Sequence, residues 1–249
     1  MVAHMNDQVD PTSQEAEGRG SMYRFLATVY LQPPTEDIVR AMDRAFVEEF
    51  VAPFSTQAAA ELSEYVVSLD SEKEIFLLKQ EYMDLFAVPG GRYVTPFEDV
   101  YRGIRQDGKQ EGGPLLGDRA VAAKIMYRTA GAEIDKACKE LPTHIGVELS
   151  FMSFLCEREA AALDNVAEAM CSEEQSKPVV TNIYRHTQMR FLQEHLNDWF
   201  PQLNQVIQAK AKTPFYRALG QLTKEYLAWD MANLMLQLGL EEAWSLDSS

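Results

Sequence analysis

Residues 145–163 of this chain read Ile145-Gly-Val-Glu-Leu-Ser-Phe-Met-Ser-Phe-Leu-Cys-Glu-Arg-Glu-Ala-Ala-Ala-Leu163. Apolar side chains recur there every three or four positions, which places them on one face of a helix. This seam consists of Ile145, Leu149, Met152, Cys156, Ala160 and Leu163. Because the pattern continues over several turns, it predicts a long helix with one face packed in the core.

Helical periodicity predicts further helices on both sides of this segment. They cover residues 22–31, 35–46, 55–69, 71–86, 116–130 and 178–196, a short helix from Pro201, and a long one from Pro214 to about Leu238. No stretch alternates apolar and polar side chains between hairpin turns, so the sequence predicts no strand. We therefore expect an all-α protein that folds as a single multi-helix globular domain.

The expected boundaries follow from the same pattern. Residues 19–242 form the helical domain, residues 1–18 a flexible N-terminal leader, and residues 243–249 a C-terminal tail. The glycine-rich connection 103–117 is either a surface loop or a hinge between two helical halves.

Composition excludes several classes of function. With 23 basic and 38 acidic residues, the formal charge is -15, which argues against binding to nucleic acid or to an anionic membrane surface. A basic peptide would be attracted instead. No segment approaches the roughly 20 apolar residues of a membrane span. The three cysteines, Cys138, Cys156 and Cys171, show no C-x-x-C spacing, so we expect no disulfide framework and a reducing, cytoplasmic compartment.

His144 and Glu148 lie four residues apart, on one face near the start of the helix quoted above. A metal-binding helical bundle with enzyme activity is one interpretation of this pair. A metal site needs three or four convergent ligands, however, and neither H-E-x-x-H nor paired E-x-x-H is present. We therefore predict no metal, no cofactor and no catalytic residue. The glycine-rich residues 112–117 are followed by Asp118 rather than the Lys-Ser/Thr of a phosphate loop.

The loop 88–101 is the other unusual segment. Its aromatic side chains are interleaved with two acids, in the order Tyr93, Pro96, Phe97, Glu98, Asp99 and Tyr101. In one interpretation the aromatics fold onto the helices and the acids face water. In the other, the loop is an aromatic and acidic rim for a basic or amphipathic peptide, because carboxylates pair with arginine and aromatics supply apolar contact area.

Three segments in register resemble the TorD family of cytoplasmic redox-enzyme maturation chaperones, which includes DmsD-like and NarJ-like relatives. They are residues 81–86, 96–101 and 142–152, and the resemblance covers roughly residues 20 to 240. It implies an all-helical chaperone, not an enzyme, that serves the catalytic subunit of a molybdopterin oxidoreductase. Such chaperones bind the twin-arginine signal peptide or the N-terminal region of that subunit until the cofactor is inserted.

The residues that match the family motifs are the candidate peptide-binding residues. They are Glu81 and Phe86 in the first segment, Pro96, Phe97, Glu98 and Tyr101 in the second, and His144 and Glu148 in the third, with Tyr93 and Asp99 added from the loop. Leu85, Val100 and Leu149 also match the motifs.

Two positions depart from the family pattern. The family commonly has Asp where this chain has Thr143, and Ser where it has Asp99. If Asp99 lies near His144, it restores the missing negative charge. We expect that replacing Glu98 and Asp99 by Lys weakens peptide binding and leaves the helices intact. A nucleotide-regulated adaptor is a further alternative, because guanine nucleotides are associated with some family members. The sequence leaves the choice between monomer and homodimer open.

Overall fold

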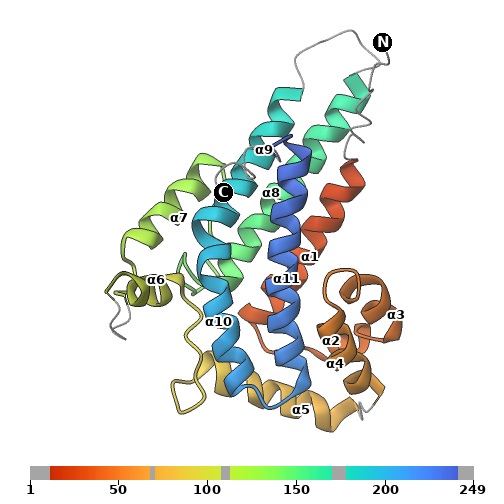
Figure 1. Ribbon diagram of the computed structural model, residues 1–249, viewed down its shortest axis with the longest axis vertical. Coiled ribbons are helices and arrows are strands. Elements are labelled where there is room, and N and C mark those ends of the chain that lie inside the picture. Colours follow the sequence, from red (N-terminus) through yellow and green to blue (C-terminus); the bar gives the residue numbers. More distant parts are fainter. Residues whose placement is uncertain (1–11, 68–70, 108–112, 170–177, 241–249) are drawn as a thin grey trace, which may run out of the picture.

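The structure is a computed structural model that describes residues 12–67, 71–107, 113–169 and 178–240. In these residues the chain runs from helix to helix and contains no strand (Figure 1). In chain order the elements are α1 (Ser13–Leu31), α2 (Glu36–Ala41), α3 (Arg44–Phe46), η1 (Val47–Val51), α4 (Thr56–Val67), α5 (Ser71–Tyr82), η2 (Met83–Ala87), α6 (Glu98–Asp107), α7 (Asp118–Thr129), α8 (Ile145–Ala169), α9 (Pro178–Phe191), η3 (Leu192–Leu196), α10 (Asn197–Lys210) and α11 (Pro214–Gln237). The segments η1, η2 and η3 are single π-helical turns. The all-α prediction is confirmed.

The long helices α1, α8, α9 and α11 run side by side through the molecule, and α10 continues the direction of α9 (Figure 1). Helix α5 crosses the base of this bundle, α2 to α4 lie on one side, and α6 and α7 lie on the other. One hydrophobic cluster contains buried residues from α1 through α11, so the described residues share a single core.

Helix α8 begins at Ile145, as the apolar seam predicts, and continues six residues beyond Leu163, to Ala169. From Ile145 to Ala160 the seam is buried. Helix α1 packs closely along α8 because two positions there are glycine. A Cβ on Gly146 would lie 2.4 Å from Cγ of Leu31, and a Cβ on Gly20 would lie 3.2 Å from Cβ of Cys156.

Two predicted helices start earlier in the structure, and helix α6 (Glu98–Asp107) was not predicted. Helix α1 begins at Ser13, and the hydroxyl of Thr12 accepts a hydrogen bond from the backbone N–H of Glu15, so a capped helix includes the last residues of the expected leader. Helix α10 begins at Asn197 rather than at Pro201. Pro201 lies inside that helix, where its ring nitrogen has no N–H to donate to the carbonyl four residues earlier, so one main-chain hydrogen bond is missing.

The connection 103–117 is only partly described. Helix α6 continues to Asp107 and α7 begins at Asp118, while residues 108–112 lie outside the described residues, as do residues 1–11 and 241–249. The hinge therefore stays a prediction. No helix of the described ranges is long and apolar enough to cross a membrane.

Candidate functional site

The family-like segments meet at a joint between α6, α8 and η3. Two backbone hydrogen bonds hold the loop before α6 against the start of α8: the N–H of Glu98 donates to the carbonyl of Thr143 (2.9 Å), and the N–H of Ile145 donates to the carbonyl of Pro96 (2.9 Å). Phe97 and His144 form the bridge between these bonds. Segments that are more than forty residues apart in the sequence are thereby fixed to each other.

Inside this joint lies a buried group that we call the glutamate cluster: Glu98, Glu148, His195 and Trp199. Nδ1 of His195 lies 2.7 Å from Oε2 of Glu98, and the indole N–H of Trp199 donates to Oε2 of Glu148 (3.1 Å). Four elements contribute, since Glu98 begins α6, Glu148 lies in α8, His195 in η3 and Trp199 in α10. All four side chains are fully buried.

The charge of the glutamate cluster is poorly compensated. Burial raises the pKa of Glu148 well above its usual value, and the neighbouring carboxylate of Glu98 raises it further. Nε of Arg102 lies 3.9 Å from Oε1 of Glu98. Oε1 of Glu98, Oε1 of Glu148 and Nε2 of His195 have no hydrogen-bond partner among the described residues. A proton on Glu148 relieves the repulsion between the two carboxyl groups.

The same three residues form the group that comes closest to a metal site in the described chain. Glu98, Glu148 and His195 each offer one ligand atom, and these atoms lie within 4.8 Å of one another. Three ligands fall short of the four that close a structural zinc site. The convergent histidine is His195 and not His144, so the His144–Glu148 pair expected from sequence spacing does not form this group.

His144 has a different role. Its Nδ1 accepts the backbone N–H of Gly146 (3.0 Å), and its ring packs edge-on against Phe97, 5.3 Å between centroids. Burial lowers the pKa of His144 to about 4, so the side chain is neutral near neutral pH. His144 therefore supports the first turn of α8.

The two departures from the family pattern touch each other. The hydroxyl of Thr143 donates to Oδ2 of Asp99 (2.7 Å), and both residues are buried. The resemblance implies Ser at the position of Asp99 and Asp at the position of Thr143, so this chain has the carboxylate and the hydroxyl exchanged. Asp99 therefore contacts the third motif at Thr143, the residue before His144.

The first motif, residues 81–86, also stabilises the fold. The carboxylate of Glu81 accepts the backbone N–H groups of Lys212 (2.5 Å) and Thr213 (3.0 Å), directly before α11, and pairs with Nη1 of Arg92 (3.2 Å). A carboxylate at this place satisfies main-chain donors at a helix N-terminus. Phe86 is buried among aromatic rings, including Tyr30, 5.7 Å away.

These contacts correct the picture of an exposed acidic rim. Of the ten candidate peptide-binding residues, only Tyr93 and Phe97 are partly exposed; the buried ones are Glu81, Phe86, Pro96, Glu98, Asp99, Tyr101, His144 and Glu148. Both interpretations of the loop place the carboxylates of Glu98 and Asp99 at the surface, and both are wrong on this point because the two residues are buried. Replacing them by Lys would place two cations in the buried joint, so we now expect this substitution to disturb the helices there.

His195 and Trp199 were not selected from the sequence. Their spacing of four residues places them on one face of a helix, which is the only local signal. Their partners Glu98 and Glu148 lie 97 and 51 positions away, so no local pattern connects them.

A second buried polar group, which we call the arginine cluster, contains Arg19 of α1. Nε of Arg19 donates to Oδ1 of Asp230 (2.5 Å) and Nη1 to Oε2 of Glu159 (3.0 Å), while Nε of Arg185 donates to Oε1 of Glu159 (2.6 Å). Gln188 hydrogen-bonds to both Arg19 and Glu159. Burial alone would lower the pKa of Arg19, but Asp230 raises it well above its usual value. Two arginines and two carboxylates balance.

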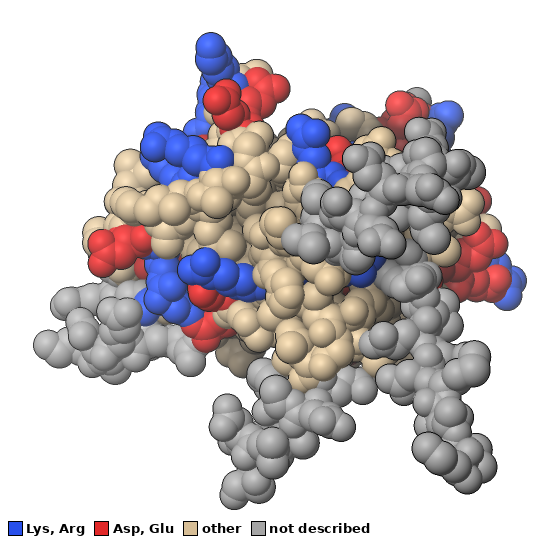
Figure 2. Space-filling view, turned by 90° about the horizontal axis from the view of Figure 1, so that it is seen from above, with Lys and Arg blue, Asp and Glu red and all other residues tan. Residues whose placement is uncertain are grey.

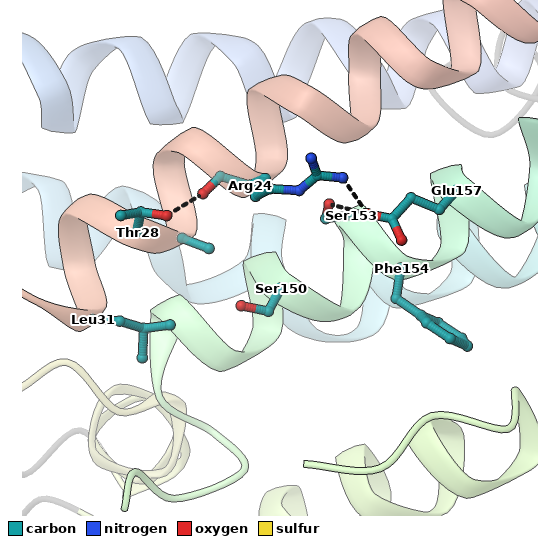
Figure 3. A pocket seen from close by; sticks show the side chains of 8 residues that line it. Arg24, Thr28, Leu31, Ser150, Ser153, Phe154 and Glu157 are labelled. Atoms are coloured by element: carbon teal, nitrogen blue, oxygen red, sulfur yellow. Dashed lines mark hydrogen bonds and ion pairs between the residues drawn. The ribbon is translucent and has the colours of Figure 1, made fainter. Parts of the chain in front are cut away.

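Two surface hollows are open to a ligand. The first, of about 260 Å³, lies between α1 and α8, and Figure 3 shows its polar edge, where Arg24 and Glu157 form an ion pair above Ser153. Leu31 and Phe154 lie at the ends of this hollow in the same view. The second, of about 490 Å³, lies between α7 and α9 and is mostly apolar.

Comparisons with known proteins agree with this architecture. Residues 48–205 match the family described as nitrate reductase delta subunit. The chain is 22% identical to the chaperone protein TorD of Colwellia psychrerythraea over 94% of this chain and 99% of that protein. It is 26% identical to the selenate reductase assembly chaperone protein of Thauera selenatis over 60% of this chain and 68% of that protein. The perchlorate reductase assembly chaperone protein of Dechloromonas aromatica is also 26% identical, over 58% and 57% of the two chains. These names describe chaperones rather than catalysts.

Proposed function

This chain belongs to the nitrate reductase delta subunit family, and we propose that it is a maturation chaperone dedicated to one molybdopterin-containing oxidoreductase. The observation that carries the proposal is the similarity to a TorD chaperone along nearly the whole length of both proteins. The assembly chaperones among the relatives are named for a single reductase each, which supports a single client here. The chaperone holds the catalytic subunit until its cofactor is inserted.

The segment that the chaperone binds is the twin-arginine signal peptide or the N-terminal region of that subunit. Such a peptide is basic at its start and apolar further on, so it needs a receptor with accessible carboxylates beside apolar surface. Glu98 and Asp99 are buried and do not supply these carboxylates. Residues 35–67 do, since they hold seven acids and two bases and include Phe50, which is 52% exposed. Glu48 and Glu49 lie next to Phe50 and are exposed.

The geometry does not support a metal-binding pair of His144 and Glu148, nor a phosphate site at the glycine-rich residues 112–117. Nδ1 of His144 is already occupied by the N–H of Gly146, so the residue does not join Glu148 in a metal-binding pair. Helix α7 begins at Asp118, whose carboxylate would repel a phosphate group at that helix N-terminus.

Calorimetric titration of the full chain with N-terminal peptides of candidate catalytic subunits tests the proposal. We expect one peptide to bind and the same peptide to lose affinity when its two arginines are replaced by Gln. Replacing Glu48 and Glu49 by Lys should weaken binding severalfold, because each exposed ion pair contributes up to about 1 kcal/mol.

The control carries the same change of charge at another exposed site, Glu15→Lys with Glu17→Lys, and should bind as the wild type does. If no candidate subunit binds as a peptide or co-purifies as the full polypeptide, the chaperone function is refuted. Equal weakening by both variants would move the binding surface away from residues 35–67.

A further inference from the structure

Three members of the glutamate cluster are residue types that bind metal ions. Glu98 begins α6, Glu148 lies in α8 and His195 lies in η3. Each residue offers one ligand atom, and these atoms lie within 4.8 Å of one another. Around a four-coordinate zinc ion, with bonds of about 2.0–2.2 Å, neighbouring ligand atoms lie about 3.4 Å apart. The three side chains therefore need only small rotations to enclose an ion.

Unpartnered polar atoms in the same residues are a second, independent observation. Oε1 of Glu98 and Oε1 of Glu148 are buried and have no hydrogen-bond partner among the described residues. The same holds for Nε2 of His195. A buried carboxylate oxygen without a donor is costly, because nothing replaces the water that it loses on folding. A cation bonded to both carboxylates satisfies oxygen atoms that no hydrogen-bond donor of the described chain reaches.

The charge of the group fits a divalent ion. At the surface, charges of both signs lie side by side, as Figure 2 shows for one face of the molecule, and solvent screens them. In the interior, Glu98 and Glu148 carry two negative charges between them. Arg102 does not cancel both, because it contacts Glu98 at 3.9 Å and also pairs with Asp198. A proton on Glu148 removes one negative charge, whereas a divalent cation compensates two.

Neighbouring residues already hold the three side chains in place. The indole N–H of Trp199 donates to Oε2 of Glu148 (3.1 Å) and leaves Oε1 of that carboxyl group free. The ring of His195 stacks on Phe191, with 4.7 Å between centroids, and its Nδ1 faces Oε2 of Glu98 at 2.7 Å. Metal sites in proteins depend on such outer partners, which orient the ligands.

The donor set selects the kind of metal. Imidazole is a ligand of zinc and its neighbours in the first transition row, whereas magnesium and calcium take oxygen ligands. Three protein ligands are enough in zinc sites that keep the fourth position open. The sequence prediction of no metal considered the pair of His144 and Glu148, and the group described here contains His195 instead.

We propose that Glu98, Glu148 and His195 bind one zinc ion, which fastens α6 and η3 to α8. The ion takes the place of two protons, one on Glu148 and one between Nδ1 of His195 and Oε2 of Glu98, and both are released to solvent. Two carboxylates and a neutral imidazole then leave the bound site without net charge. The binding of zinc does not depend on the chaperone function or on the identity of the client.

Calorimetric titration of the chelator-treated full chain with zinc tests the proposal. We expect one equivalent to bind and the melting temperature to rise with zinc concentration. In Glu148→Gln the affinity should fall about a hundredfold or more, because even the loss of an outer partner costs roughly ten- to a hundredfold. Glu194→Gln is the matched control, since it makes the same change on an exposed residue next to His195 and should bind zinc as the wild type does.

Cobalt(II) locates the ion. Because Trp199 bonds to Glu148, a paramagnetic ion in this site should quench the emission of Trp199, and the W199F chain identifies that share of the signal. Zinc should reverse the quenching by competition, and magnesium at the same concentration should not. Circular dichroism checks that Glu148→Gln keeps its helices, and Glu98→Gln provides the same test of binding if it does not.

Three outcomes overturn the proposal. A wild-type chain that takes up no zinc at micromolar free metal leaves the proton as the compensating charge of the cluster. Equal zinc affinity of the wild type and a folded Glu148→Gln or Glu98→Gln chain places the metal elsewhere, and so does cobalt uptake without quenching of Trp199. Client peptides that still bind the metal-free chain would leave the proposed function untouched, so the two proposals fail separately.

Discussion

The arginine cluster and the glutamate cluster are both buried, both join several helices, and differ in charge. In the first, Arg19 and Arg185 face Glu159 and Asp230, so every charge has a partner of opposite sign. In the second, Glu98 and Glu148 share one histidine and a distant arginine. In the first, ion pairs compensate the buried charges, whereas in the second, burial and the neighbouring Glu98 raise the pKa of Glu148 and favour its protonated form. The same principle, compensation of buried charge, thus has two solutions in one bundle.

The sharpest way to break the arginine cluster is to remove its central cation. In Arg19→Met, Asp230 and Glu159 lose their shared partner in the core, and we expect the free energy of unfolding to fall by about 3–5 kcal/mol. Urea denaturation measures this loss. Arg24→Met is the matched control on the same helix, because the ion pair of Arg24 with Glu157 is exposed and should contribute less than about 1 kcal/mol. Equal losses would contradict the comparison.

Replacing one glutamate by glutamine in each cluster should change the free energy of unfolding by different amounts. Glu159→Gln removes a charge that two arginines need, and we expect a loss of about 3 kcal/mol. Glu148→Gln mimics the protonated acid that burial already favours, so we expect no loss of stability at neutral pH. A large loss for Glu148→Gln would show that this residue is ionised in the folded protein.

The pH dependence of the free energy of unfolding, measured for the wild type and for Glu148→Gln, tests whether Glu148 is protonated in the folded protein. Because the folded pKa of Glu148 is raised above 4.5, the folded state holds a proton that the unfolded state releases. The contribution of Glu148 to stability is therefore complete below about pH 4.5 and is lost as the pH rises toward the raised pKa. The Glu148→Gln chain should lack this loss in urea denaturation at several pH values.

A further comparison concerns the exchanged pair at the border of the glutamate cluster. Thr143→Asp places a second carboxylate beside Asp99, and we expect a loss of about 2 kcal/mol from like charges in a buried place. The double variant T143D/D99S restores a hydroxyl opposite a carboxylate and should recover most of that loss. A double-mutant cycle in urea denaturation measures the coupling. Additive losses would mean that the two positions do not compensate each other.

Much of the fold could be predicted because its signals are local. The seam from Ile145 to Ala160 repeats every three or four residues, and the helix that it predicts starts where the structure places it. The segment from Pro178 to Leu196 was predicted as one helix and is α9 followed by the π-helical turn η3. Proline position misled the prediction at Pro201, because this helix contains the proline inside it and lacks one main-chain hydrogen bond there.

The candidate site could be predicted only in part. The motif residues do meet, as shown by Glu98 and Glu148 in one cluster and by Thr143 against Asp99. The exposure of these acids was predicted wrongly, because acids in a loop usually face water. Nothing in the local sequence shows that they contact His195 and Trp199. A buried acid is recognised by its partners, and those partners lie on other helices.

The sequence by itself determined the helices, the acidic balance of the chain and the resemblance to a chaperone family, since periodicity, charge and motif order are properties of neighbouring residues. The tertiary structure alone decided which side chains face one another. In it, Glu98 contacts His195, which lies 97 positions away, and eight of the candidate binding residues are buried. It also left Ile125 and Ile183 open to water between α7 and α9. Burial and charge compensation depend on contacts between distant segments, and only the folded chain brings those segments together.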